Sequence, residues 1–157
     1  MSHADIQLLP RIGLGFLLAY ILGFERELRG SPAGDRTFSL VGAAAAAITA
    51  VTHANSPQAV AGIITGVGFI GGGVVFHGSG GLIKGVTTAA TIFATAGVGV
   101  VVGYGHLVLG AIVSAGLLLT LELQHIPYLN WLDAQHYRGR FEVDAALMEP
   151  DQRNAST

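Results

Sequence analysis

The feature that most constrains this chain is the near absence of charge over its central part. Between residues 37 and 121 the only residue with a formal charge is Lys84. Charged residues make up 11% of the 157 residues, whereas about 25% is usual for a soluble domain. So few charges cannot cover the surface of a soluble protein of this size. The chain is therefore predicted to be an integral membrane protein.

Five apolar segments alternate with polar or turn-forming segments. The predicted spans are 8–24, 37–53, 59–76, 86–103 and 106–123. Each is close to the short end of the roughly 17–25 residues that cross a bilayer. We therefore expect an all-α integral membrane bundle of about five transmembrane helices in residues 1–123, followed by a short cytoplasmic polar tail in residues 124–157. The glycine-rich third or fourth span could instead be re-entrant.

Lysine and arginine are distributed unevenly between the two predicted membrane faces. With five spans, all of them except Arg11 fall on one side. These residues are Arg26, Arg29, Arg36, Lys84, Arg138, Arg140 and Arg153. Because positive residues stay cytoplasmic, the pattern predicts an N-terminus outside and a C-terminus inside.

The third predicted span is dense in glycine as well as apolar. Its glycines are Gly62, Gly66, Gly68, Gly71, Gly72 and Gly73. In water each interior glycine would weaken a helix by roughly 0.5–1 kcal/mol relative to alanine, but in lipid the helix persists and glycine lets neighbouring helices approach. We expect these glycines to pack helices together, with this span at the centre of the bundle. Gly15, Ala19 and Gly23 form another small-residue face on the first span.

Polar residues gather at the ends of spans on the positively charged side. They are Glu25, Arg26, Arg36, Thr37, Lys84, Thr87 and Thr88. These residues could form an ion-paired cluster at the cytoplasmic mouth of the bundle, or they could simply anchor the helices at the interface and fix the topology. The helix that begins near Thr87 could bind an anion at its N-terminus. The alternative is a helix start capped by its own threonines.

Residues suited to bind a metal or to catalyse a reaction are few. Glu25 and Glu27 are candidates for a hydrated divalent cation such as Mg²⁺, which keeps its waters and uses one or two carboxylates. His53, His77 and His106 lie far apart and on different faces, which does not favour a metal site. The chain has no cysteine, no Ser/His/Asp arrangement and no carboxylate pair at membrane depth. We therefore expect no enzymatic activity, no cofactor other than a possible Mg²⁺, and no nucleic acid partner.

Four short segments carry a resemblance to a known family. They are GFERE at 23–27, AGDRT at 33–37, GVGFIGGG at 66–73 and KGVTTAA at 84–90. In order and spacing they resemble the motifs GxERE, AGLRTH, GIGFLGAG and GLTTAA of the MgtC/SapB family of membrane proteins. The chain departs from the family pattern at Asp35, Phe38, Gly72, Val86 and Phe93.

The resemblance implies a multi-pass protein of the bacterial inner membrane that is linked to growth at low magnesium and to survival inside host cells. It implies a regulator of other membrane proteins, such as a P-type cation pump or the F-type ATP synthase. The matching residues to which it assigns this role are Glu25, Arg26, Arg36, Thr37, Gly68, Lys84, Thr87 and Thr88. Many members carry an ACT-like domain after the last span, for which the polar tail here is too short. We therefore expect either a short member without this domain or a chain that stops in the domain's first strand, near residues 141–144.

The sequence and the resemblance leave three candidate functions. The leading one is a non-enzymatic regulator that binds itself, with a dimer favoured, and a partner through its glycine faces. The second is a transporter or channel for magnesium or another cation, although intramembrane carboxylates usually mark a cation path and none lies between Asp35 and Glu122. The third is an assembly scaffold that binds membrane lipids, with head groups beside Arg26, Arg29 or Lys84.

Overall fold

The computed structural model describes residues 3–52, 56–76 and 84–123. Five helices occupy this part of the chain: α1 (His3–Leu28), α2 (Asp35–Thr52), α3 (Pro57–Phe76), α4 (Val86–Gly103) and α5 (Leu107–Glu122). The chain divides into two compact units, Met1–Leu118 and Leu119–Thr157, and the packing described below is that of the first unit. The expected polar tail and the strand at 141–144 lie outside the described residues.

The helical membrane fold is confirmed. Three helices are long and apolar enough to cross a membrane, over Ile6–Leu28, Pro57–Val75 and Val86–Gly103, and α5 is a shorter apolar helix. α4 has the predicted bounds, and the starts of α2, α3 and α5 lie within two residues of those expected. The orientation of the two termini stays a prediction.

α1 is longer than the predicted span at both ends. Its C-terminal end is set by Gly30, whose φ of 65° is a left-handed conformation that favours glycine. The N–H groups of Gly30 and Ser31 donate to the carbonyl groups of Glu27 and Arg26, which is the hydrogen-bond pattern of a Schellman motif. The segment 23–27, expected to run from the end of a span into a loop, is therefore wholly helical.

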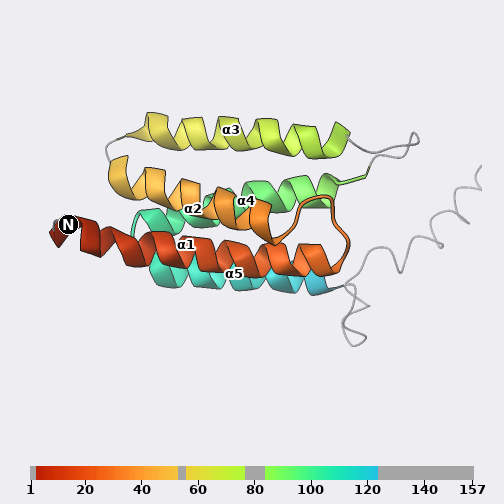
Figure 1. The fold of residues 1–157 in the computed structure, drawn as a ribbon, viewed down its shortest axis with the longest axis horizontal. Coiled ribbons are helices and arrows are strands. Elements are labelled where there is room, and N and C mark those ends of the chain that lie inside the picture. The colour runs from red at the N-terminus through yellow and green to blue at the C-terminus, as the bar shows by residue number, and fades with distance from the viewer. Residues whose placement is uncertain (1–2, 53–55, 77–83, 124–157) are drawn as a thin grey trace, which may run out of the picture. The chain divides into compact units, whose positions relative to one another are not determined.

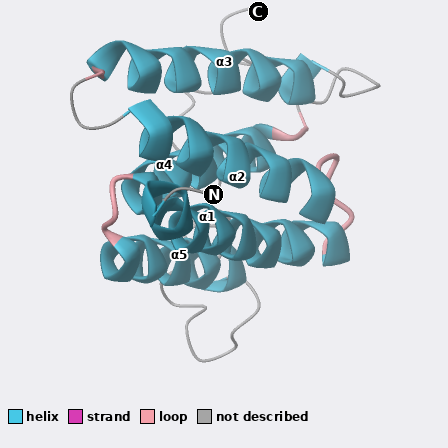
Figure 2. Cartoon of the chain, turned by 60° about the vertical axis from the view of Figure 1, so that its left-hand side comes forward, coloured by secondary structure: helices cyan, strands magenta, loops and turns pink. Residues whose placement is uncertain are grey.

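The helices run alternately in opposite directions, so that the end of α1 and the starts of α2 and α4 lie at the same end of the bundle (Figure 1). α3 lies on one side of α2 and α4, and α1 and α5 lie on the other side (Figures 1 and 2). α2 and α4 each contact α1, α3 and one another, whereas α3 packs mainly on α4. α2 and α4 therefore form the middle of the bundle, and the prediction that α3 occupies this position is wrong.

Small residues bring α1, α2 and α4 into contact at the level of the backbone. A Cβ atom added to Gly99 of α4 would lie 2.6 Å from the carbonyl oxygen of Gly42 on α2 and 2.8 Å from the Cβ of Ala45. A Cβ added to Gly42 would overlap that of Ala19 on α1. Other glycines that meet a neighbouring helix this closely are Gly15, Gly23 and Gly103. The predicted small-residue face of α1 is confirmed.

The glycines of α3 are placed differently. A Cβ atom would meet nothing outside the helix backbone within 4 Å at Gly62, Gly66, Gly68, Gly72 and Gly73. Only Gly71 packs inward, where a Cβ would lie 3.6 Å from that of Ala89 on α4. The buried face of α3 also contains Ile63 and Val67. Glycine permits close approach but does not decide which face a helix turns inward, which explains why these glycines do not hold the bundle centre together.

Glycines of α4 that lie two residues apart provide a test of this packing. We expect Gly99→Ala to lower the free energy of unfolding by about 1–3 kcal/mol, because its methyl group would collide with the backbone of α2. Gly97→Ala is the matched control, since a Cβ there meets nothing within 4 Å. Unfolding of both variants in the same detergent measures the difference. Equal destabilisation by the two substitutions would contradict the close contact.

Candidate functional site

The segments 23–27 and 33–37 lie against each other where α1 ends and α2 begins. A Cβ atom added to Gly23 would lie 2.6 Å from the Cβ of Phe38, 2.7 Å from the Cα of Asp35 and 2.9 Å from the carbonyl oxygen of Gly34. The first turn of α2 therefore passes directly over Gly23. The two segments form one structural unit, because the glycine of the first makes room for the backbone of the second.

The second segment makes room for the first in the same way. A Cβ added to Gly34 would coincide with the carboxylate of Glu27, which therefore lies over the glycine. Gly34 directly precedes α2, and its carbonyl oxygen accepts a hydrogen bond from the N–H of Phe38 at 3.1 Å. A carboxylate is favourable here because a helix N-terminus carries a partial positive charge. Asp35 adds a second carboxylate in the first turn of α2.

A polar hollow of about 340 Å³ lies at this helix start. The residues that line it are Glu27, Gly34, Asp35, Arg36 and Thr37. The backbone N–H of Arg36 donates to Oδ1 of Asp35 at 2.6 Å. The hollow thus combines two carboxylates, one guanidinium group and one hydroxyl group, a set of groups that suits a small polar or hydrated ligand better than an apolar one.

Glu25 occupies a separate and more buried position. Its carboxylate contacts two arginines: Nε of Arg26 lies 2.9 Å from Oε2, and Nε of Arg29 donates to Oε1 at 3.3 Å. The first contact is an ion pair without hydrogen-bond geometry, so Oε2 accepts no hydrogen bond from the described residues. The i,i+4 pairing of Glu25 with Arg29, which requires α1 to continue outward, is therefore formed. Two positive charges compensate this buried carboxylate.

The start of α4 is the third polar element of this end of the bundle. Lys84 and Thr87 are exposed, whereas Thr88 is buried. The N-cap residue is Gly85, with a φ of 86° and no side-chain hydrogen bond to the helix start. The hydroxyl of Thr91 donates to the carbonyl oxygen of Thr87 one turn earlier. Threonines of α4 therefore bond to the backbone of their own helix, as one alternative expected, but the cap position is taken by glycine and not by threonine.

The end of α1 and the starts of α2 and α4, which carry the predicted polar residues, lie at one end of the bundle (Figure 1), but these residues fall into separate groups. Glu25 and Arg26 belong to the ion-paired group, Glu27, Arg36 and Thr37 to the hollow, and Lys84, Thr87 and Thr88 to the start of α4. Within the part of the chain that the structure describes, no three His, Asp or Glu residues are grouped to hold a metal ion. Binding of Mg²⁺ by Glu25 and Glu27 stays a prediction, and the two carboxylates belong to different groups.

Sequence reasoning missed the role of Arg11 at the opposite end. Its Nη1 donates to the carbonyl oxygen of Gly103 at 3.3 Å, where α4 ends and leaves carbonyl groups without helical partners. The guanidinium also lies beside Gly105, whose φ is 94°. The only sign of this contact in the sequence was an isolated arginine near the start of α1, from which no more than a position at the membrane interface could be predicted.

Comparison with known proteins gives a consistent set of relatives. The model of the MgtC family matches residues 12–126. Protein MgtC of Brucella abortus is 36% identical over 138 residues, which cover 84% of this chain and 57% of that protein. Protein SapB of Bacillus subtilis is 32% identical over 116 residues, or 66% of this chain and 50% of that protein.

Protein SrpB of the cyanobacterium Synechococcus elongatus is 32% identical over 160 residues, which cover 90% of this chain and 87% of that protein. The chain therefore spans 87% of the length of SrpB and little more than half of Brucella MgtC. No solved structure matches the chain.

The contacts of the α1–α2 hairpin predict different costs for two alanine substitutions. Gly23→Ala should lower the free energy of unfolding by about 1–3 kcal/mol, because the methyl group meets the backbone of α2. Gly34→Ala should cost less than about 1 kcal/mol, because it displaces only the flexible carboxylate of Glu27 from the helix start. Unfolding in detergent measures both.

A double-mutant cycle completes this test. In a Glu27→Gln background the cost of Gly34→Ala should shrink, because the charged group is already gone, while the cost of Gly23→Ala should not change. If Gly34→Ala costs as much as Gly23→Ala, or if Glu27→Gln leaves its cost unaltered, the assignment of Glu27 to the start of α2 is wrong.

Proposed function

The chain belongs to the MgtC family, and from that premise we propose that it is a non-enzymatic membrane regulator tied to magnesium limitation and cation homeostasis. It acts through helix–helix contact with other proteins of the bacterial inner membrane. A P-type cation pump and the F-type ATP synthase are the candidate partners that the family resemblance suggests. The same contact surface is proposed to join two copies of the chain.

The observation that carries this proposal is the outward face of α3. Gly62, Gly66 and Phe69 follow each other at i, i+4 and i+7, a spacing that places them on one face of a helix. All three are exposed, Phe69 to 86%, and a Cβ at either glycine would meet no other atom within 4 Å. We name this surface the outer glycine face.

Such a face suits contact with a second helix in lipid. Between membrane helices no hydrophobic driving force exists, so association depends on close packing, which glycine permits by exposing the helix backbone. Phe69 projects beside the two glycines of this face, and its side chain can pack between side chains of a partner helix. α2 uses small residues in this way inside the bundle, where Gly42 meets both Ala19 and Gly99.

Large side chains on the outer glycine face should abolish partner binding. We expect the double substitution Gly62→Leu/Gly66→Leu to weaken self-association by tenfold or more, equivalent to about 1.4 kcal/mol. Fluorescence energy transfer between copies in liposomes measures self-association, and pull-down of the pump and the synthase from native membranes measures partner binding. The chain has no cysteine, so one introduced cysteine carries the fluorophore.

The matched control is Gly13→Leu on α1. Gly13 is also exposed, and a Cβ there meets nothing within 4 Å. This variant should retain both self-association and partner capture. Retention of both by the Gly62→Leu/Gly66→Leu variant, or an equal loss in Gly13→Leu, would count against the outer glycine face.

A cation transporter is the second candidate function, and the buried carboxylate of Glu25 is the observation that favours it. Against it stand the two arginines that already compensate Glu25. We expect liposomes that contain only this protein to take up Mg²⁺ no faster than protein-free liposomes, measured with an enclosed Mg²⁺-sensitive dye. Uptake that requires the folded protein and is lost in Glu25→Gln would replace the regulator by a transporter.

A further inference from the structure

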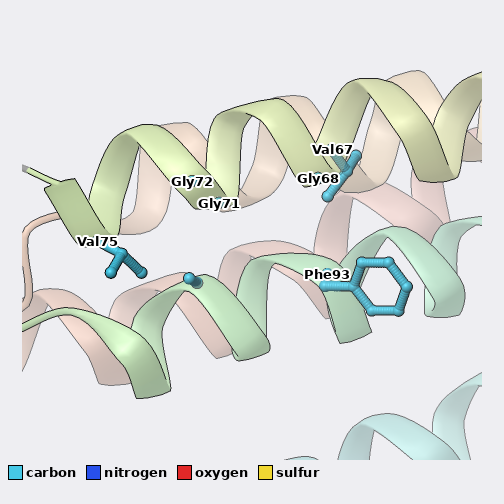
Figure 3. Close-up of a pocket in the computed structure, with 7 residues that line it drawn as sticks. Val67, Gly68, Gly71, Gly72, Val75 and Phe93 are labelled. Atoms are coloured by element: carbon cyan, nitrogen blue, oxygen red, sulfur yellow. The ribbon is translucent and has the colours of Figure 1, made fainter.

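A second open surface of α3 lies between that helix and α4. It is a groove of about 350 Å³ that is lined by Val67, Gly68, Gly72 and Val75 of α3 and by Phe93 of α4 (Figure 3). Apart from backbone atoms its walls are hydrocarbon. The two glycines keep it open, because a Cβ at either would meet nothing within 4 Å. This groove is distinct from the outer glycine face, whose residues do not line it.

The dimensions of the groove suit a single hydrocarbon chain. Val67 and Val75 are eight residues apart, so at 1.5 Å per residue the groove is about 12 Å long. The groove is open along one side, so an acyl chain can enter it from the surrounding lipid and lie along the helix surface. One leaflet of a bilayer contributes about 15 Å of hydrocarbon. The groove therefore runs from the end of α3 to about the middle of the membrane.

A positive charge stands at the outer end of the groove. A Cβ added to Gly85 would lie 3.0 Å from the carbonyl oxygen of Val74, so the segment that contains Lys84 abuts the last turn of α3, next to Val75. Lys84 is exposed and forms no ion pair with a described residue. The sequence contains no acidic residue between Asp35 and Glu122. No carboxylate of α3, of α4 or of the segment that joins them can therefore neutralise this lysine.

The start of α4 adds to the positive potential at the same place. Its N-cap residue is glycine and supplies no side-chain acceptor, so the first backbone N–H groups of α4 have no capping side chain. The partial positive charge of a helix N-terminus has the same sign as Lys84. An apolar groove that opens at a cationic rim is complementary to a molecule with a hydrocarbon chain and an anionic head.

We propose that the groove between α3 and α4 binds one acyl chain of an anionic phospholipid, whose phosphate pairs with Lys84 and the first turn of α4. The lipid completes the weakly covered side of α3, whose buried residues are Ile63, Val67 and Gly71. This site does not depend on the proposed regulatory function, because it uses another face of α3 and another class of ligand.

Native mass spectrometry of the full chain tests the proposal. The delipidated protein is mixed with equal amounts of phosphatidylglycerol and phosphatidylcholine that carry the same acyl chains. We expect one phosphatidylglycerol to be retained per chain at concentrations where phosphatidylcholine is not. Lys84→Gln should weaken this binding about fivefold, the effect of one cation near a lipid phosphate, and Gly72→Leu should weaken it by more than tenfold by filling the groove.

Two control variants separate this site from general effects. Arg36→Gln removes an exposed cation at the same end of the bundle, and Gly66→Leu adds the same side chain to the other face of α3. Both should bind phosphatidylglycerol as the original chain does. Equal retention of the two lipids, or unaltered binding by Gly72→Leu with its fold intact by circular dichroism, would overturn the proposal. Loss of self-association in Gly72→Leu with lipid binding unchanged would also overturn it, since a second copy would then occupy the groove.

Discussion

The fold depends on close approach between three helix backbones. Gly42 of α2 lies between Ala19 of α1 and Gly99 of α4, and each of these contacts leaves no room for one additional methyl group. In lipid no hydrophobic force drives helices together, so van der Waals contact over a matched pair of surfaces must hold them. This requirement places α2 between α1 and α4, because Gly42 of α2 meets small residues on both of these neighbours. It also leaves α3 packed on α4 through few buried residues, with two of its surfaces facing away from the core.

The charged end of the bundle follows from the same geometry. Gly23 lets the start of α2 lie on α1, and Gly34 lets the carboxylate of Glu27 lie over that start. Two segments that look like separate motifs in the sequence are therefore the two halves of one hairpin. Arginines compensate Glu25 beside this hairpin, whereas Lys84 at the start of α4 forms no ion pair with a described residue. The α1–α2 side thus carries carboxylates and arginines together, whereas α3, α4 and the segment between them carry one lysine and no carboxylate, which is why the two sides suit different ligands.

Much of this fold could be predicted from the sequence, because the hydrocarbon of the membrane determines which segments form helices. Long uncharged runs must become helices in hydrocarbon, so α4 has the expected bounds and the other apolar runs gave the right elements. The position of α3 could not be predicted in this way. A high density of glycine shows that a helix tolerates close neighbours, but it does not show which face of the helix is buried. In α3 the buried face is the one that carries Ile63 and Val67. Glu25 and Glu27 point in different directions because α1 continues through residue 28. Because the predicted span ended at residue 24, this separation could not be predicted from the sequence.

The most direct test of this account is a measurement of helix contacts in the unmodified chain. Solid-state NMR of the protein in lipid bilayers, with ¹³C at glycine Cα and alanine Cβ, reports such contacts without a substitution. The close packing of α2 predicts cross-peaks that join Gly42 to Ala19 and Gly99 to Ala45. Absence of both, together with cross-peaks from the glycines of α3 to the alanines of α1, would show that α3 and not α2 packs beside α1.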